Sequence, residues 1–349
     1  MVIDTSVGSV ILRIKYLNMK ISDHLKKTYY QLRAFIYKIP VNIRIEACTL
    51  CDLDCADCYM RKDNYANMGK GYLKFVDFKN LIERNPFIQS VELSMSGEIF
   101  LNPELLEIIK FADEKKIKLT AYNGVNFNNI SDKMIENLVK YKFDGLTFSI
   151  DGTSNETYSQ YRRKGNFDKV IDNIKKLNYY KALYKSKFPN LRWQFILMNH
   201  NEHELLTAKK MCKELGMEKI YFLFPWDGKY QPKDVDLIEQ ETDLIFKRST
   251  YEKHELKYKK YTKHFLCNQL WNQPQFNWDG RLLGCCCGTY IDLGINLFTE
   301  GYEGALRSPK LKYMKRVLRG ECAPDESIPC FHCKTYKFMK EKNRFINLP

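Results

Sequence analysis

The sequence predicts an α/β protein built around a parallel sheet and followed by a small cysteine-rich module. Two observations lead to this fold class. Short apolar runs of strand length alternate with amphipathic stretches of helical length through the middle of the chain, which is typical of βαβ units. The cysteines gather in two groups, one near the start of this alternating region and one after its end. A chain of 349 residues is long enough for such a domain and a second module.

The alternating region contains six candidate strands and five candidate helices. The candidate strands are residues 42–47, 90–94, 118–122, 145–150, 192–197 and 219–224. The candidate helices are residues 75–84, 103–115, 131–141, 167–180 and 203–215. We expect each crossover between parallel strands to be right-handed. The alternation fits a partial barrel or an open doubly wound sheet, and the periodicity does not choose between them.

The periodicity divides the chain into four segments. They are an N-terminal extension (1–40) with one candidate helix at 21–36, the alternating region (41–225), a polar stretch expected to be a helical linker (226–266), and the cysteine-rich module (267–349). The module has poor periodicity and many cysteines, so we expect metal ions to stabilise it.

Composition argues against a secreted or membrane protein. Neither an export signal nor an apolar stretch of membrane-spanning length occurs. Eleven of the twelve cysteines gather in the two groups, so cysteines are expected to serve as metal ligands in a cytoplasmic protein. The formal net charge of +14 is spread along the chain, which indicates solvated helix faces more than an anionic partner. The missing membrane-spanning stretch gives no reason to expect a membrane partner, and the absence of a basic motif interleaved with aromatic residues argues against nucleic acid as one.

The first cysteine group follows the first candidate strand. Cys51, Cys55 and Cys58 are separated by three and then two residues, so their thiolates can each bind a different iron of one cubane cluster. The fourth iron is then open to a substrate. Cys48 adds a fourth thiol, and if it capped that iron, no substrate could bind there. The alternatives are a zinc site and a fully ligated, ferredoxin-like cluster.

This cysteine motif, with Tyr59 after its last cysteine, resembles that of the radical S-adenosylmethionine (SAM) superfamily. The resemblance implies a partial (β/α)6 radical SAM barrel at 41–225, with a [4Fe-4S] cluster bound by Cys51, Cys55 and Cys58. It also implies that SAM chelates the open iron and that Tyr59 contributes to the cofactor site. Asp57 departs from the family pattern, because an aromatic residue often precedes the third cysteine.

Later motifs extend the resemblance and imply further SAM-binding residues. A segment similar to the family's Gly-Gly-Glu ends in Glu98, with Ser96 in place of the first glycine, and the acid is expected to hold the SAM ammonium. Asn123 lies in a segment that resembles Thr-Asn-Gly. Ser149 and Arg162 match positions that contact the carboxylate and ribose of SAM, although the next residue, also arginine, competes for the second role.

The second cysteine group resembles the SPASM and twitch extensions of radical SAM enzymes. Cys267, twelve residues, Gly280, four residues and Cys285 are followed by the pair Cys330 and Cys333. This resemblance implies one auxiliary [4Fe-4S] cluster bound by these four cysteines, whereas a structural zinc site of four thiolates is the alternative. No further cysteine occurs in the sixteen residues after Cys333, so a twitch or truncated SPASM domain is expected at 267–349.

Three cysteines in the second region have no assigned role. They are Cys286, Cys287 and Cys322. One of them could replace Cys285 as a ligand, and Cys286 or Cys287 could donate a hydrogen atom in an epimerisation. An Asn-Trp-Asp-Gly sequence at 277–280 predicts a hairpin turn just before them.

The resemblance implies an enzyme that reductively cleaves SAM to a 5′-deoxyadenosyl radical and abstracts hydrogen from a substrate. We expect a small polar substrate, such as a sugar, cyclitol or nucleotide-linked sugar, to be oxidised, epimerised or rearranged. The forty residues before Val41 look too few for a leader-binding domain, which disfavours the alternative of a maturase for ribosomally made peptides. An external electron donor such as flavodoxin or ferredoxin is expected, and no catalytic residue is assigned.

A non-enzymatic function is the remaining alternative: the protein would then be an iron–sulfur electron carrier or a zinc-bound scaffold. It requires Cys48 to cap the first cluster. It also leaves the polar residues Glu98, Ser149 and Arg162 at the strand ends unexplained.

Overall fold

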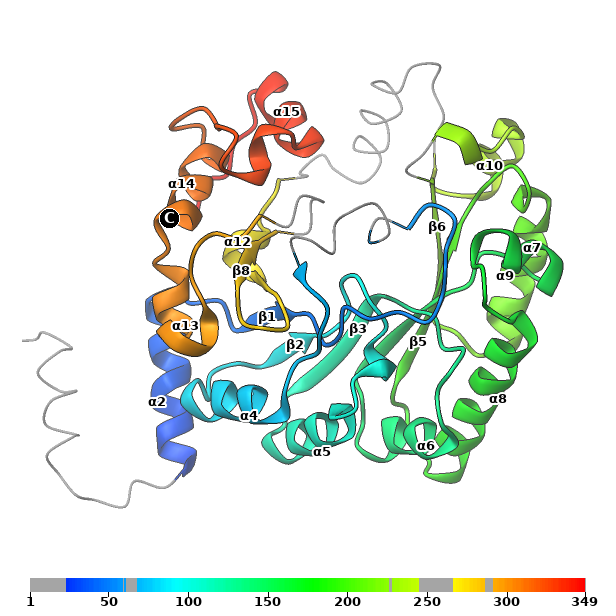
Figure 1. The fold of residues 1–349 in the computed structure, drawn as a ribbon, viewed down its shortest axis with the longest axis horizontal. Helices are drawn as coiled ribbons and strands as arrows, with labels where there is room; N and C mark the ends of the chain where they lie inside the picture. The colour runs from blue at the N-terminus through cyan, green and yellow to red at the C-terminus, as the bar shows by residue number, and fades with distance from the viewer. Residues whose placement is uncertain are drawn as a thin grey trace, which may run out of the picture.

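A computed structural model of the protein describes residues 23–58, 60, 68–225, 228–244, 266–285 and 291–348. Its centre is an eight-stranded sheet in the order β6-β5-β4-β3-β2-β1-β7-β8 (Figure 1). The first six strands are β1 (Asn42–Ile45), β2 (Ser90–Glu92), β3 (Lys118–Val125), β4 (Gly145–Ser149), β5 (Asn190–Ile196) and β6 (Lys219–Leu223). All six predicted strands are therefore present, with ends that differ by a few residues.

The order of these strands decides between the two predicted architectures. Strands β1 to β6 pair in parallel with their neighbours in the sequence. A doubly wound sheet reverses its strand order at a switch point, and this sheet has none between β1 and β6. The other edge of β1 pairs with β7 and not with β6, so the sheet is an open barrel. The predicted partial barrel is confirmed.

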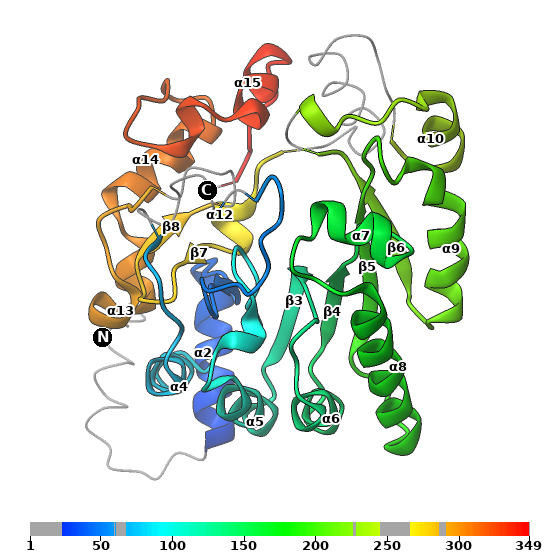
Figure 2. The same ribbon diagram turned by 45° about the vertical axis from the view of Figure 1, so that its right-hand side comes forward.

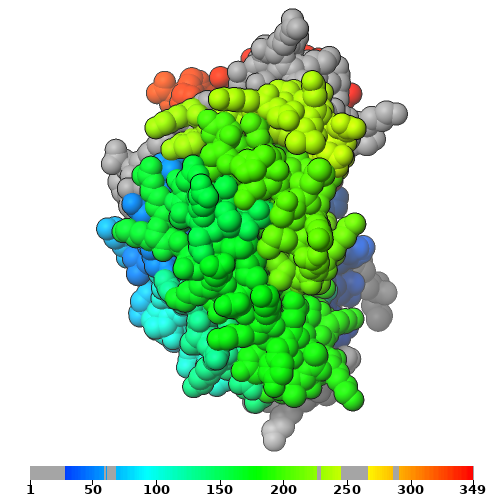
Figure 3. Space-filling model, turned by 90° about the vertical axis from the view of Figure 1, so that its right-hand side faces the viewer, coloured from blue at the N-terminus to red at the C-terminus, as the bar shows by residue number. Residues whose placement is uncertain are grey.

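Helices follow the strands on the outer side of the sheet (Figures 1 and 2). They are α4 (Phe75–Arg84), α5 (Leu105–Lys115), α6 (Asp132–Lys140), α7 (Asn155–Tyr161), α8 (Phe167–Leu183) and α9 (Leu205–Glu214). Helix α7 was not predicted as a separate element; Ser154 caps it by accepting the N–H of Thr157. In Figure 3, residues coloured green to yellow-green, which include α8 and α9, cover most of the side turned to the viewer.

The two faces of the sheet differ in polarity. Ile43 and Ile45 of β1 are fully buried in the main hydrophobic core. Because side chains alternate along a strand, Arg44 points to the opposite face. Its register partner on β2 is Glu92, which pairs in turn with Thr120 of β3. The face away from the hydrophobic core is therefore lined by polar side chains.

The C-terminal module adds a hairpin to this sheet. Strands β7 (Gln275–Phe276) and β8 (Leu282–Gly284) are antiparallel, and β7 pairs in parallel with β1. The predicted turn at 277–280 is present, with Asn277 N–H donating to Arg281 O at 2.9 Å and φ of +86° at Gly280. The sequence did not predict that this hairpin would extend the barrel sheet.

Short helices complete the module and the segments around it. They are α12 (Gln269–Asn272), α13 (Leu297–Leu306), α14 (Pro309–Leu318) and α15 (Lys334–Glu341), with α2 (Asp23–Ile36) in the N-terminal extension and α10 (Val235–Glu241) in the predicted linker. The rest of the predicted linker helix, at 245–265, lies outside the described residues. No helix in the described ranges is long and apolar enough to cross a bilayer.

The N-terminal extension packs on the C-terminal module. Arg33 of α2 forms an ion pair with Glu303 of α13. Tyr302, also on α13, donates its hydroxyl hydrogen to Pro40 O at 2.9 Å. These contacts connect the N-terminal extension to α13 of the C-terminal module.

Candidate functional site

The first cysteine loop lies at the carboxyl ends of the barrel strands, directly after β1. Two backbone hydrogen bonds tie it to the segment that ends α7: Asp54 N–H donates to Arg163 O at 3.0 Å, and Ala56 N–H donates to Tyr161 O at 2.9 Å. Loops at this edge of a parallel sheet converge on one mouth. The first and fourth βα units therefore meet at the cysteine motif.

Two side chains donate hydrogen bonds to the cysteine sulfurs. Asn126 Nδ2 lies 3.8 Å from Cys51 Sγ, and Arg162 Nη1 lies 3.6 Å from Cys55 Sγ. Hydrogen bonds to sulfur are one of the means by which a protein sets the potential of an iron–sulfur cluster. Asn126 was not predicted as a site residue. Its only signal in the sequence is the asparagine-rich stretch after the third strand.

Burial keeps these thiols protonated until a cation binds. Burial, and then the charges of Glu98 and Cys55, raise the pKa of the Cys51 thiol to about 12. Burial also raises the pKa of Cys55, against the opposing effect of the Arg162 charge, and the charge of Cys58 adds to the rise. Metal binding at such a site must therefore release protons.

The three thiols fit a cluster better than a single ion. Within the described ranges, no three His, Cys, Asp or Glu side chains are arranged to hold one metal ion. In a cubane each thiolate binds its own iron, so the sulfurs surround the cluster without meeting at one point. Cys51 lies beside Cys55, and Cys55 lies beside Cys58, close enough for each charge to affect the next thiol.

Cys48 has a different environment. It is fully buried and forms an isolated antiparallel bridge with Tyr72. Burial, and then the charges of Glu46 and Glu98, raise its pKa to about 11. A Cβ atom on Gly97 would lie 2.0 Å from Cys48 O, so only glycine allows this close approach of the two loops.

Glu98 forms hydrogen bonds with three loops of the site. Its two carboxylate oxygens accept N–H groups from Phe100 at 3.2 Å and Asn126 at 2.6 Å, and its own N–H donates to Leu50 O at 2.8 Å. Burial raises the pKa of Glu98 to about 7. The carboxylate predicted to hold the SAM ammonium thus also fixes the backbone around the cysteine loop.

Glu46 is a buried carboxyl that sequence reasoning missed. Its Oε2 accepts the N–H of Ser96 at 2.8 Å, whereas Oε1 has no hydrogen-bond partner in the part of the chain that the structure describes. Burial raises the pKa of Glu46 to about 8. The signal in the sequence was a lone acid at the end of an apolar strand, just before the cysteines. An orphaned buried oxygen at this place is available to a cationic group.

Asn123 and Ser149 lie at the ends of neighbouring strands. Asn123 Nδ2 donates to Ser94 O at 2.6 Å, and its Oδ1 accepts from Arg44 at 3.4 Å. Ser149 is buried at the end of β4, and a Cβ on Gly124 would lie 2.3 Å from its hydroxyl oxygen. Glycine, with φ of +117°, is therefore required beside Ser149.

Arg162 is held by a buried carboxylate. Its Nε donates to Asp151 Oδ2 at 2.5 Å, and Asp151 Oδ1 accepts the N–H of Ile196 at 2.6 Å. Asp151 therefore orients Arg162. The competing Arg163 is exposed, and the predicted Tyr59 lies outside the described residues.

The second cysteine group is brought together from three separate segments. Cys267 precedes α12, Cys285 follows β8, and Cys330 and Cys333 lie before α15. Burial, and then the charges of Cys285, Cys267 and Cys333, raise the pKa of Cys330 above its usual range. The four predicted auxiliary ligands thus lie close enough for their charges to interact. Because no three described His, Cys, Asp or Glu side chains are arranged to hold one metal ion, these buried or half-buried thiols, like the first three, fit a cluster better than a single zinc ion. Cys286 and Cys287 lie outside the described residues, and Cys322 is half-buried.

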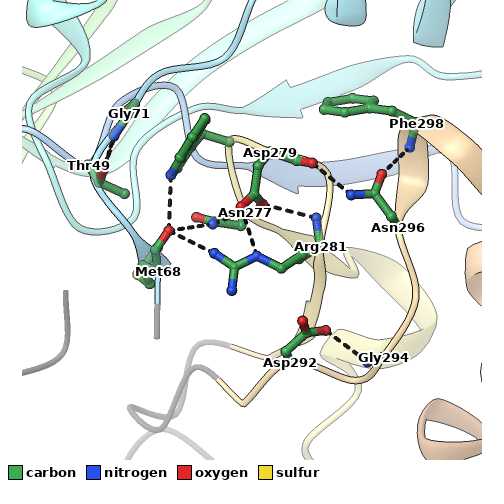
Figure 4. Close-up of polar contacts among 11 residues, drawn as sticks. Thr49, Met68, Gly71, Asn277, Asp279, Arg281, Asp292, Gly294, Asn296 and Phe298 are labelled. Carbon is green, nitrogen blue, oxygen red and sulfur yellow. Dashed lines mark hydrogen bonds and ion pairs between the residues drawn. The ribbon is translucent and has the colours of Figure 1, made fainter. Parts of the chain in front are cut away.

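The hairpin of the second module contacts the segment that follows the first cysteine loop (Figure 4). Met68 O accepts three hydrogen bonds from it: from Asn277 Nδ2 at 2.7 Å, from Trp278 Nε1 at 3.0 Å and from Arg281 Nη2 at 2.9 Å. A Cβ on Gly71 would lie 2.5 Å from the Trp278 ring. The two cysteine regions are therefore connected by tight packing at this hairpin.

Comparison with known proteins gives a family and several relatives. The family model described as the Radical SAM superfamily matches residues 45–184. The antilisterial bacteriocin subtilosin biosynthesis protein AlbA of Bacillus subtilis is 22% identical over 297 residues, which are 78% of this chain and 61% of AlbA. A probable GTP 3′,8-cyclase of Methanocaldococcus jannaschii is 24% identical over 179 residues, 50% of this chain and 56% of the cyclase. The chain thus spans less than two thirds of either relative.

Solved structures show the same fold at low sequence identity. SuiB of Streptococcus suis bound to S-adenosylmethionine has a TM-score of 0.62 at 16% identity, over 95% of this chain and 80% of SuiB. The structure of anSMEcpe with bound AdoMet and the Cp18Cys peptide has a TM-score of 0.54 at 15% identity, over 85% of this chain and 87% of that chain.

Proposed function

This chain belongs to the radical SAM superfamily and is an iron–sulfur-dependent enzyme; from that premise we propose that it modifies a ribosomally made peptide. The observation that supports the chemistry is the trio Cys51, Cys55 and Cys58 at the mouth of the barrel. The charges of these three thiols affect one another, whereas Cys48 is fully buried and no described cysteine is among the groups that shift its pKa. If only these three cysteines bind the four-iron cluster, its fourth iron is open to SAM.

The residues of the mouth bind and orient the cofactors. When bound by Cys51, Cys55 and Cys58, a reduced cluster would supply the one electron needed to cleave SAM to methionine and a 5′-deoxyadenosyl radical. Arg162 and Asn126 donate hydrogen bonds to cysteine sulfurs, which favours the thiolate form that binds iron. The Glu98 carboxylate is expected to hold the SAM ammonium, and Oε1 of Glu46, which has no partner among the described residues, can accept a hydrogen bond from the same cationic group. Asn123 and Ser149 supply polar groups at the adjacent strand ends for the rest of SAM.

The second cysteine group is proposed to hold one auxiliary [4Fe-4S] cluster. Its ligands are Cys267, Cys285, Cys330 and Cys333, and the neighbouring positions of these thiols support the assignment. In domain terms, residues 41–225 form the radical SAM core and residues 267–349 the auxiliary cluster domain. Zinc in the second site is the alternative that metal analysis decides.

A peptide substrate is favoured by the relatives. AlbA is named for bacteriocin biosynthesis, and SuiB has been solved bound to its precursor peptide SuiA. The expectation of a small polar substrate rests on the short form of the second cysteine region and on the length of the segment before Val41, and neither is a direct observation of a substrate. A small polar molecule remains the second candidate, because the face of the barrel sheet away from the core is polar and the cyclase relative is named for GTP.

The cofactor assignment is tested by anaerobic reconstitution. The protein should bind about eight irons, as two four-iron clusters. With dithionite it should convert SAM to 5′-deoxyadenosine. Cys51→Ala, Cys55→Ala and Cys58→Ala should each abolish this conversion, and Cys48→Ala serves as the matched control that retains it. Loss of cleavage in Cys48→Ala alone would contradict the assignment of the trio.

The substrate class is tested by offering both kinds of substrate to the reconstituted enzyme. A short peptide encoded beside the gene should change in mass, and the change should require SAM and be absent with Cys58→Ala. Deuterium placed at the reacting carbon should appear in 5′-deoxyadenosine. Turnover of a sugar, cyclitol or nucleotide-linked sugar, with no change in the peptide, would favour the second candidate.

A further inference from the structure

The part of the module around the second cysteine group is strongly basic. Residues 307–348 contain eleven Lys or Arg and four Asp or Glu. The excess of seven positive charges is half of the net charge of the chain, in about an eighth of its length. Positive charge that is scattered elsewhere in the chain is therefore concentrated here.

A row of three lysines on α15 forms the exposed part of this charge. Lys334, Lys337 and Lys340 are exposed, and their spacing of three places them along one side of the helix. Thr335, Tyr336 and Met339 on the same helix are buried. Within the described part of the chain, none of the three lysines takes part in an ion pair. The row is therefore available to a partner.

The lysine row begins at the candidate auxiliary cluster. Cys333 is the N-cap of α15, so Lys334 is the next residue after a proposed cluster ligand. Other basic residues of the module are already engaged: Arg316 and Arg319 pair with Glu321, and Lys315 lies over the Trp271 ring. The lysines of this row, which begin beside the second cysteine group, are thus also the ones that remain available to bind a partner.

The first cysteine loop has the opposite charge. Asp52, Asp54 and Asp57 lie between its cysteines, and residues 49–60 contain no Lys or Arg. Part of the Cys51 residue is exposed although its thiol is desolvated, so this loop also reaches the surface. An acidic protein would be repelled by the first loop and attracted to the second module.

We propose that the lysine row of α15 is the docking surface for an acidic one-electron carrier protein, which delivers its electron through the auxiliary cluster. This rests on the proposed function. Each transfer oxidises the carrier by one electron. That electron is consumed when the carbon–sulfur bond of SAM breaks to give methionine and a 5′-deoxyadenosyl radical. Small acidic carriers such as flavodoxins have the required chemistry.

The test compares two charge-reversal variants of the cluster-loaded, full-length enzyme. The first variant is Lys334→Glu, Lys337→Glu and Lys340→Glu. The matched control is Lys79→Glu, Lys110→Glu and Lys133→Glu, which changes the net charge equally on exposed positions of α4, α5 and α6, far from α15 (Figures 1 and 2). The measurements are the dissociation constant of an acidic flavodoxin at low and high salt, and the rate at which reduced flavodoxin bleaches the cluster absorbance.

We expect the α15 variant to weaken flavodoxin binding about tenfold at low salt and to lose most of its salt dependence. Reduction by flavodoxin should slow in parallel. The control should keep both values near those of the wild type, and reduction by dithionite should be equal in all three proteins. That last readout separates a docking defect from damage to the clusters.

Two outcomes would overturn the proposal. They are equal weakening of flavodoxin binding in both variants and unchanged flavodoxin binding in the α15 variant. Failure of wild-type enzyme to cleave SAM with dithionite would instead contradict the proposed function, because flavodoxin binding is measured without SAM.

Discussion

The two cysteine regions are built in opposite ways. The first is a continuous loop of eight residues, Cys51 to Cys58, held at the edge of the sheet by side chains that directly follow β3 and α7. The second collects four thiols from segments up to 66 residues apart, between Cys267 and Cys333. The first is acidic between its cysteines and the second is surrounded by lysines. One region is arranged by the barrel, whereas the other depends on its own module being folded.

This difference bears on how each region responds to metal. The barrel holds the first loop through backbone and side-chain hydrogen bonds that do not involve metal. The second site joins α12, β8 and α15, so metal binding there should contribute directly to the folding free energy of the module.

The largest expected effect separates the two regions by function. Cys58→Ala should lower dithionite-driven SAM cleavage on the order of a thousandfold, because the cluster that supplies the electron is lost. Cys330→Ala should halve the iron content but retain SAM cleavage with dithionite, while lowering the melting temperature of the module. The measurements are iron, 5′-deoxyadenosine and calorimetry. Equal loss of SAM cleavage in the two variants would remove the distinction.

A second substitution tests how firmly the barrel holds the first region. Arg162→Met leaves the Asp151 carboxylate buried without its partner, which should cost about 3–5 kcal/mol in the free energy of unfolding. It also removes the hydrogen bond to Cys55 Sγ, so the reduction potential of the cluster should fall. Arg163→Met, on an exposed residue, is the control. Denaturant titration of the apoprotein and a redox titration of the loaded protein provide the two measurements.

A third prediction concerns pH. The pKa of Glu46 is about 8 in the folded protein, above the ordinary value of 4.5. A raised carboxyl pKa means that the folded state binds more protons than the unfolded state, so stability falls as pH rises from 4.5 to 8. Glu46→Gln removes this loss and should gain about 2–4 kcal/mol over the wild type at pH above 8, but little at pH below 4.5. Denaturation at several pH values measures the difference in unfolding free energy between the variant and the wild type. A difference that does not change with pH would mean that Glu46 is ionised throughout, and it would contradict this prediction.

The smallest expected effect tests the contact between the regions. Gly71→Ala would push a methyl group into the Trp278 ring and should destabilise the protein by about 1–3 kcal/mol. In a double-mutant cycle, Trp278→Ala should absorb most of that cost, because the ring that clashes is gone. Additive effects of the two substitutions would mean that the hairpin does not pack on this segment.

Most of the barrel could be predicted from local patterns. Helix α4 was predicted with the ends that the structure has, and the six strands were found within a few residues. The predictions erred where side chains bind the backbone: α5 begins at Leu105 and not Pro103, because Asn102 Oδ1 accepts the N–H of Glu104 at 2.8 Å. Helix α7 was not predicted because its seven residues are too few to show a helical period in the sequence.

The sequence by itself determined the alternating order of strands and helices, the cysteine spacings and the polar residues at the strand ends. Spacing and periodicity are local properties of the sequence, so they can be recognised without a structure. Only the tertiary structure decided that β7 lies beside β1, that Asp151 holds Arg162, and that Asn126 and Glu46 belong to the site. Each of these depends on segments far apart in the chain whose contacts form only when the sheet brings them together.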